Sequence, residues 1–172
     1  ERSRYVTWQC DSVVHPSWVE FVKLPDGDTV RVEACGEVFA SRSGKVAYYQ
    51  ARLEQLEASA HYTYRVVTQG DASDWFDFET HPTGTRSFAF LYVGDVQDTL
   101  QGETNRFLRE ALHRHPLCEF TICGGDFVER PTDSYWGEAF RNIDSIGQCM
   151  PFVTVTGNHD YFKGVVQRIE RR

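Results

Sequence analysis

The chain has 172 residues, of which 41% are hydrophobic and 25% charged, and its formal net charge is −7. This composition is ordinary for a globular protein, and the length allows one large domain or two small ones. The acidic balance argues against a nucleic acid surface, which needs clustered lysine and arginine. No apolar run approaches the roughly 20 residues that span a bilayer, so we expect no membrane span.

The first 80 residues are predicted to be all-β. Six short runs are rich in β-branched and aromatic residues, and turn-forming Pro, Gly, Asp and Ser separate them. These runs cover residues 5–9, 18–22, 29–33, 46–49, 62–67 and 75–78. Six or seven short strands in a segment of about this length favour a β-sandwich. Trp8 is expected to be the large core residue of an early strand.

Residues 56–64 resemble the tyrosine corner of fibronectin type III-like domains. The resemblance implies that Leu56 packs inward and that the Tyr62 hydroxyl, six residues later, bonds to backbone upstream. It therefore implies a fibronectin type III-like sandwich over residues 1–80.

The chain has five cysteines, which are Cys10, Cys35, Cys118, Cys123 and Cys149. They form no CxxC pair, which argues against a structural zinc site. Cys118 and Cys123 are expected to be small buried apolar residues around a strand. Cys10 and Cys35 either pair across two sheets, if the protein is exported, or stay reduced, and an odd total leaves at least one cysteine without an intrachain partner.

A polar stretch containing Pro and Gly, residues 81–86, is predicted to link this domain to a second one over residues 87–172. The spacing of the hydrophobic residues along the sequence changes after the linker. Residues 87–93 are nearly all apolar, as expected for a strand buried on both faces.

Helices and strands are predicted to alternate through the rest of the second domain. Helical spacing favours one helix over residues 103–113, stopped by Pro116, and a second helix that begins after Thr132. Further strands are predicted over residues 119–123 and 151–155, which gives a βαβαβ order. The first helix should place these residues on one face: Phe107, Leu108, Ala111 and Leu112.

Polar segments follow the three predicted parallel strands. They are residues 94–97 (Gly-Asp-Val-Gln), 125–129 (Gly-Asp-Phe-Val-Glu) and 157–160 (Gly-Asn-His-Asp). Asp95 and Asp126 are 31 residues apart, and Asp126 and Asn158 are 32 apart. A strand, a crossover helix and the next strand occupy a gap of this size. The three segments should therefore meet at the carboxyl edge of the sheet, where open α/β sheets bind ligands.

The residue types at this edge point to a two-metal hydrolase. Two cations about 3.5–4 Å apart can clamp a phosphoryl group and generate a hydroxide nucleophile, and hard oxygen ligands suit them. Asp126 is the best-placed bridge, with Asp95 on the first metal and the Asn158 amide oxygen on the second. His159 would face the substrate beside Asn158, protonating the leaving oxygen or stabilising phosphoryl charge, and Asp160 would orient its ring. Taken one at a time, three of these residues are equally well explained as turn residues after strands: Asp95, Asp126 and Asn158.

Together the three segments resemble the N-terminal half of the calcineurin-like metallophosphoesterases, whose pattern is D-x-H, then G-D-x-x, then G-N-H-[DE]. With a sandwich in front, the chain is most similar to the purple acid phosphatase branch. The resemblance implies a phosphoester substrate, two divalent or trivalent ions of the Fe, Zn or Mn class, and attack on phosphorus by a metal-bound hydroxide. It also implies a secreted or periplasmic protein.

Two positions depart from that pattern. Gln97 stands where many members carry a His ligand, and it offers a weaker amide oxygen. Glu129 stands where purple acid phosphatases carry a tyrosinate, so no purple colour is expected. Glu129 is either a replacement ligand or a solvated loop acid.

The C-terminal part of the pattern is also missing. The family has three further His ligands after G-N-H-[DE], whereas the 12 residues after Asp160 contain no His. We therefore expect an incomplete phosphoesterase domain that is inactive in isolation and leaves apolar surface exposed along its missing half.

Two other functions fit parts of the sequence. The chain is either a non-catalytic binding or adhesion module, with an unknown partner on the sandwich and a vestigial phosphoesterase half-domain, or a nucleotide-binding Rossmann-like domain. No G-x-G-x-x-G follows the first predicted strand of the second domain, which argues against the latter. Metal dependence separates the hydrolase from both.

Overall fold

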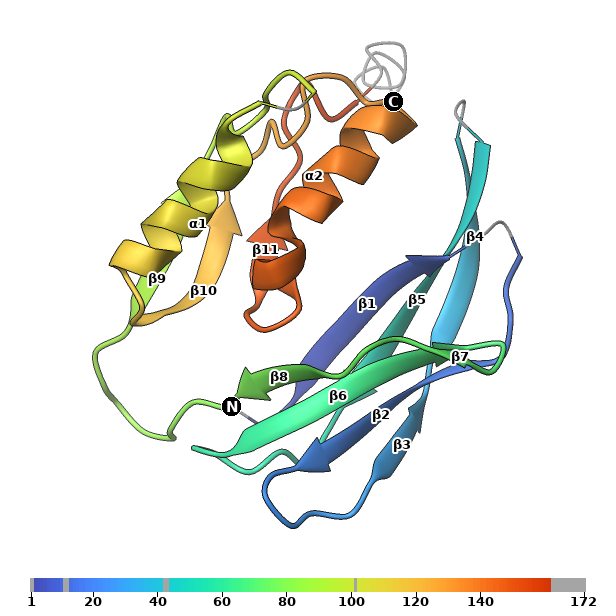
Figure 1. Cartoon of the computed structure of the whole chain (residues 1–172), viewed down its shortest axis with the longest axis vertical. Helices are drawn as coiled ribbons and strands as arrows, with labels where there is room; N and C mark the ends of the chain where they lie inside the picture. The colour runs from blue at the N-terminus through green and yellow to red at the C-terminus, as the bar shows by residue number, and fades with distance from the viewer. Residues whose placement is uncertain (1, 11–12, 42–43, 101, 162–172) are drawn as a thin grey trace, which may run out of the picture. The chain divides into compact units, whose positions relative to one another are not determined.

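The computed structural model describes residues 2–10, 13–41, 44–100 and 102–161. The chain divides into two compact units, Glu1–Thr85 and Arg86–Arg172, and each is described by itself (Figure 1). Among the described residues, no helix combines the length and the apolar character needed to cross a membrane.

The described residues of the first unit form strands and loops, without a helix. Two antiparallel sheets have the orders β1-β5-β4 and β3-β2-β6-β7, and β8 pairs with β6 in the second sheet (Figure 1). The strands are β1 (Arg4–Cys10), β2 (Ser17–Lys23), β3 (Val30–Glu33), β4 (Cys35–Ser41), β5 (Gly44–Leu53), β6 (His61–Thr68), β7 (Asp71–Ala72) and β8 (Phe76–Glu79).

The core of this unit is formed by alternate side chains of its strands. Along β5, the side chains of Ala47, Tyr49, Ala51 and Leu53 are buried and those between them are exposed, as the two-residue period of a strand requires. The buried cluster takes residues from both sheets, so the sheets pack face to face as a sandwich. Trp8 is partly buried, and its ring stacks on Tyr49 with 5.3 Å between centroids.

The Tyr62 hydroxyl makes the hydrogen bond that the sequence predicts. The backbone N–H of Glu57 donates to the Tyr62 hydroxyl oxygen over 2.9 Å. Leu56, next to this bond, is buried in the core cluster. The bond ties the loop before β6 to the ring that stacks on Phe78, with 5.2 Å between centroids.

In the second unit, the residues that the structure describes form a parallel sheet and two helices. Its elements are β9 (Ala89–Val93), α1 (Thr104–Arg114), β10 (Cys118–Cys123), α2 (Asp133–Gly147) and β11 (Phe152–Thr154). The sheet order is β11-β10-β9, and both strand pairs are parallel. Both helices lie on one face of the sheet (Figure 1), where Leu108, Cys123 and Ile143 belong to one buried cluster.

The expectation that β9 is buried on both faces is wrong. Phe88, Phe90 and Tyr92 have exposed fractions of 60%, 45% and 66%. The reason is that the helices cover one face only, so alternate side chains of β9 project from the uncovered face. The ring of Phe120 from β10 stacks there on Phe90, with 5.2 Å between centroids. An exposed apolar face was the expectation for an incomplete phosphoesterase domain.

Among the described residues, which include all five cysteines, no disulfide forms. Cys123 is fully buried on the helix-covered face and Cys118 is partly buried, whereas both were expected to be buried. Of the two alternatives for Cys10 and Cys35, the structure has the unpaired one.

Candidate functional site

Three loops leave the carboxyl ends of β9, β10 and β11, and backbone hydrogen bonds join them. The Asp95 N–H donates to the Gly125 carbonyl over 3.1 Å, and the Gln97 N–H donates to the Asp126 carbonyl over 3.0 Å. The third loop is joined through the backbone N–H of His159, which donates to Asp126 Oδ1 over 2.7 Å. The structure thus brings the three predicted segments together.

The chain conformation in these loops depends on close backbone approach. Asp95 and Asp126 have φ values of 50° and 51°, in the left-handed region that Asp tolerates better than most residues. A Cβ on Gly157 would lie 2.2 Å from Asp126 Oδ1, and one on Gly125 would lie 2.9 Å from the Gly157 nitrogen. Backbone strain of this kind concentrates at functional sites.

The predicted metal ligands fit only part of a metal centre. Asp126 is half-buried, whereas Asp95 and Asn158 are exposed, and all three offer the hard oxygens that such cations prefer. Within the part of the chain that the structure describes, however, no group of three or more His, Cys, Asp or Glu side chains could hold a metal ion. These residues therefore do not fit a complete two-cation centre.

The Gln97 side chain links the first loop to the second. Its amide NH2 lies against two carbonyl oxygens, at 2.7 Å from that of Asp126 and 3.3 Å from that of Asp95. Carbonyls only accept hydrogen bonds, so the Gln97 side-chain nitrogen, and not its oxygen, is assigned to the position facing these two carbonyls. The side chain therefore acts as a donor inside the protein, at the position where the sequence predicted a weak ligand.

The His159 ring lies beside Glu129. Its Nδ1 is 2.9 Å from the Glu129 carbonyl oxygen and 3.8 Å from Glu129 Oε2. Because a carbonyl only accepts, this hydrogen bond places the proton on Nδ1. The two interpretations of Glu129 were a ligand or a solvated acid, and the structure places it as a neighbour of the imidazole.

The Asp160 carboxylate is buried and contacts backbone. Its Oδ1 accepts from the N–H groups of Phe127 and Val128, over 2.9 and 3.1 Å, and its Oδ2 accepts from the Gly157 N–H over 2.8 Å. The side chain was predicted to orient His159. In the structure, its bonds from Phe127 and Val128 tie the third loop to the second, and its bond from Gly157 lies within the third loop.

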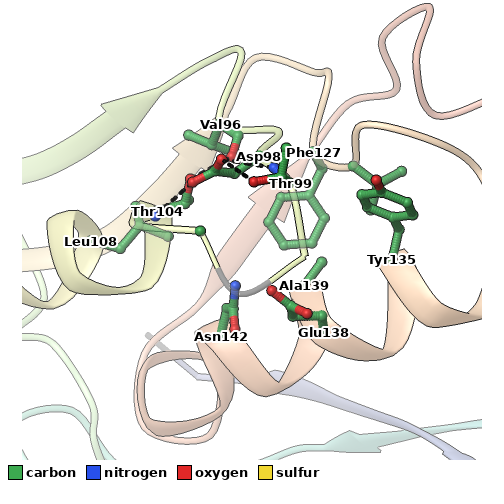
Figure 2. Close-up of a pocket in the computed structure, with 12 residues that line it drawn as sticks. Val96, Asp98, Thr99, Thr104, Leu108, Phe127, Tyr135, Glu138, Ala139 and Asn142 are labelled. Carbon is green, nitrogen blue, oxygen red and sulfur yellow. Dashed lines mark hydrogen bonds between the residues drawn. The ribbon is translucent and has the colours of Figure 1, made fainter.

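A cavity next to these loops is too small for a substrate. It lies between the start of α1 and the side of α2 (Figure 2) and measures about 30 Å³. That volume suits one or two water molecules. Its lining includes Val96, Phe127 and Val128 from the loops, with Leu108 and Ala139 from the helices.

Residues 1–80 match the family model of the purple acid phosphatase N-terminal domain. The first 80 residues are therefore purple acid phosphatase-like. The structure of purple acid phosphatase PPD1 from yellow lupin (Lupinus luteus) seeds matches 92% of this chain at 17% identity and a TM-score of 0.77. The structure of PhoD matches 87% of it at 15% identity and a TM-score of 0.53.

At these identities the two structures establish likeness of fold. This chain covers 33% of either matched chain, so it spans about a third of their length. A comparison with curated protein sequences gives no match.

Asp98 is a polar residue beside the strand-end loops that sequence reasoning missed. Its Oδ1 accepts from the Thr99 N–H over 2.7 Å, and its Oδ2 accepts from the Thr104 N–H over 3.3 Å (Figure 2). The same Oδ2 accepts from the Glu103 N–H over 2.7 Å. It thereby satisfies donors at the start of α1 and closes the loop that carries Asp95. The only sequence signal is an Asp shortly before a helix, and its distance of six residues from Thr104 is longer than that of an ordinary N-cap.

Replacing Asp98 by Asn should destabilise the second unit in a pH-dependent way. The hydrogen bond from the Thr99 backbone, followed by those from Glu103 and Thr104, lowers the pKa of Asp98. A lowered folded-state pKa contributes stability above the unfolded pKa, and this contribution is lost as pH falls through the folded value. Urea unfolding at pH 7 and pH 3 should therefore show a deficit for Asp98→Asn that shrinks in acid.

Thr104→Val is the matched control, because it removes an uncharged partner of the same carboxylate. The Thr104 hydroxyl lies 3.3 Å from Asp98 Oδ2 and 2.9 Å from the Val96 carbonyl oxygen. Its deficit should shrink less in acid than that of Asp98→Asn, because the bond from the Thr104 hydroxyl to the Val96 carbonyl does not depend on the charge of Asp98. An Asp98→Asn deficit that is equal at pH 7 and pH 3 would contradict the assignment.

Proposed function

We propose that this chain is part of a metal-dependent phosphoester hydrolase of the acid phosphatase kind. The observation that carries the proposal is the hydrogen-bonded cluster of three strand-end loops with Asp95, Asp126, Asn158 and His159 on them. The likeness to purple acid phosphatase and to PhoD supports a phosphoesterase. Two cations of the Fe, Zn or Mn class, when bound, would neutralise phosphate charge and activate water. Export to the periplasm or the exterior belongs to the same proposal.

We assign three residues of this chain as cation ligands: Asp126, Asp95 and Asn158. Asp126 is assigned as the bridging ligand, because its loop lies between the other two loops. Asp126 lies on the central loop and already contacts the third one through His159. The described residues do not complete a two-cation centre. We therefore expect residues 1–172 alone to bind metal weakly and to show no phosphatase turnover.

His159 is assigned to the substrate side, next to Asn158. With Nδ1 donating to the Glu129 carbonyl, Nε2 is the ring nitrogen that takes up or releases a proton. The Glu129 carboxylate, 3.8 Å from Nδ1, forms an ion pair when the ring is protonated. The protonated ring can then assist a leaving oxygen or stabilise phosphoryl charge.

Metal binding by the chain tests this proposal. We expect Mn²⁺, followed by electron paramagnetic resonance, to bind the wild-type chain weakly and Asp126→Asn at least about tenfold more weakly, since the substitution removes a charged oxygen ligand. Asp71→Asn, an exposed change in the sandwich, is the control and should leave binding unchanged.

Equal Mn²⁺ affinity of the wild type and Asp126→Asn would contradict the assigned ligands. Robust hydrolysis of 4-nitrophenyl phosphate by residues 1–172, abolished by Asp126→Asn, would contradict the expected inactivity.

A non-catalytic binding or adhesion module is the second candidate. The observation that favours it is the lack of a complete metal-binding group among the described residues. This function predicts that neither the wild type nor any loop variant binds Mn²⁺, so the same titration separates the two.

A further inference from the structure

Asp160 has an unusual environment for a carboxylate at the edge of a sheet. Its exposed fraction is 7%. A buried charge is costly unless hydrogen bonds satisfy it, and bonds from N–H groups to a carboxylate are among the stronger ones in proteins. Both oxygens of Asp160 are used in this way, by Phe127, Val128 and Gly157.

Two of these donors directly follow Asp126 in sequence. The N–H groups of Phe127 and Val128 point at Asp160 Oδ1, so the carboxylate fixes the direction of the chain just after Asp126. In the opposite direction, the N–H of His159, which precedes Asp160, donates to Asp126 Oδ1. Each aspartate therefore holds the backbone next to the other one.

The third bond of Asp160 lies within the third loop. Its Oδ2 accepts from the N–H of Gly157, and a Cβ built on Gly157 would lie 2.2 Å from Asp126 Oδ1. The same carboxylate thus holds the residue that lies against Asp126 as well as the direction of the second loop.

We propose that Asp160 is a positioning residue that sets the location of the Asp126 carboxylate through the backbone of Phe127 and Val128. The inference rests on the proposed function only in taking Asp126 as the residue whose position matters. It replaces the prediction that Asp160 works by orienting the His159 ring.

Amide hydrogen exchange on the full chain, read residue by residue by NMR, tests the inference without metal. The reporter is the His159 N–H, because its protection measures the bond to Asp126 Oδ1. Asp160→Asn keeps the shape but turns an NH2 toward N–H donors. We expect exchange of the His159 amide to become about tenfold faster or more, as for a buried donor that loses its acceptor. The amide of Ile122, inside β10, should change less than about twofold.

Two outcomes would overturn the inference. Unchanged exchange of the His159 amide would show that the Asp126 bond does not depend on Asp160. An equal change at His159 and Ile122 would show that the substitution only weakens the whole unit.

His159→Asn distinguishes a role of Asp160 through the backbone from a role of Asp160 through the His159 imidazole. The variant removes the ring and keeps the backbone N–H. If Asp160 acts through the backbone, the amides of Phe127 and Val128 should keep their protection in this variant. Loss of that protection would favour the imidazole route and overturn the inference.

Asp126→Asn provides the test if Asp160→Asn does not fold, because coupling between two groups is reciprocal. The variant weakens the acceptor of the His159 N–H. We then expect faster exchange of the Phe127 and Val128 amides as well, and unchanged exchange at both would overturn the inference. The Mn²⁺ titration tests the proposed function separately. If the wild-type chain binds no Mn²⁺, the proposed function fails, but the exchange rates, which are measured without metal, still test the role of Asp160.

Discussion

Gly157→Ala is expected to displace the Asp126 carboxylate and to remove metal binding by the chain. The added Cβ would lie 2.2 Å from Asp126 Oδ1 and 2.3 Å from the Asp126 nitrogen. The nitrogen belongs to the backbone, so the second and third loops must separate. Overpacking of this kind costs about 1–3 kcal/mol, and the bond from the His159 N–H would be lost with it. Urea unfolding of the second unit and Mn²⁺ titration should show both effects.

Gly137→Ala is the matched control for this substitution. Gly137 lies inside α2, and the nearest atom to its added Cβ is the mobile Arg141 Nη1, at 3.4 Å. Ala is the better helix former by about 1 kcal/mol, so this variant should be as stable as the wild type or more so. Gly157→Ala with the stability and Mn²⁺ affinity of the wild type would contradict the close approach of the loops.

Leu53→Ala is expected to cause the largest loss of stability in the first unit. Leu53 has an exposed fraction of 0% and lies in the cluster that both sheets share. Truncating a buried Leu removes apolar burial and leaves a cavity, which together cost about 2–5 kcal/mol. The midpoint of urea unfolding, followed by the NMR signals of the first unit, should fall accordingly.

Gln50→Ala on the same strand is the control. Gln50 is exposed and points away from the core, and it pairs with Thr7 and Cys35 in the neighbouring strands. Surface changes of this kind stay within about 0.5 kcal/mol. If Leu53→Ala cost as little as Gln50→Ala, the cluster would not be the core of the unit.

The sequence locates most elements of the fold, and its errors have physical causes. α1 was predicted over residues 103–113 and is Thr104–Arg114. β4 was missed because it is an edge strand with exposed Val38 and Phe39, so its residues show no alternation, and pairing with β5 is what forms it.

Burial was harder to predict than the elements themselves. Phe107 was expected on the buried face of α1 beside Leu108, yet Phe107 is 60% exposed and Leu108 is 4% exposed. A helix that packs against one sheet face buries a narrow stripe, and periodicity alone does not give the width of that stripe.

The location of the site could be predicted, but the contacts of its side chains could not. Strand spacing was enough to gather Asp95, Asp126 and His159 at one sheet edge. The acceptor found by each backbone N–H depends on loop geometry, which sequence spacing does not encode. Asp160 and Gln97 therefore received chemical roles from the sequence, whereas the structure uses their side chains as links between loops.

The bonds that hold the site together also constrain the order in which the chain folds. The bond between His159 and Asp126 spans 33 residues, and those from Phe127 and Val128 to Asp160 span 33 and 32. Each can close only after the parallel strands have found their register, and such long-range pairing is slow because loop closure must come first. In pulsed hydrogen exchange during refolding, the His159 amide should therefore gain protection after those of β10. The geometry on which the proposed chemistry depends would be the last part of the unit to mature.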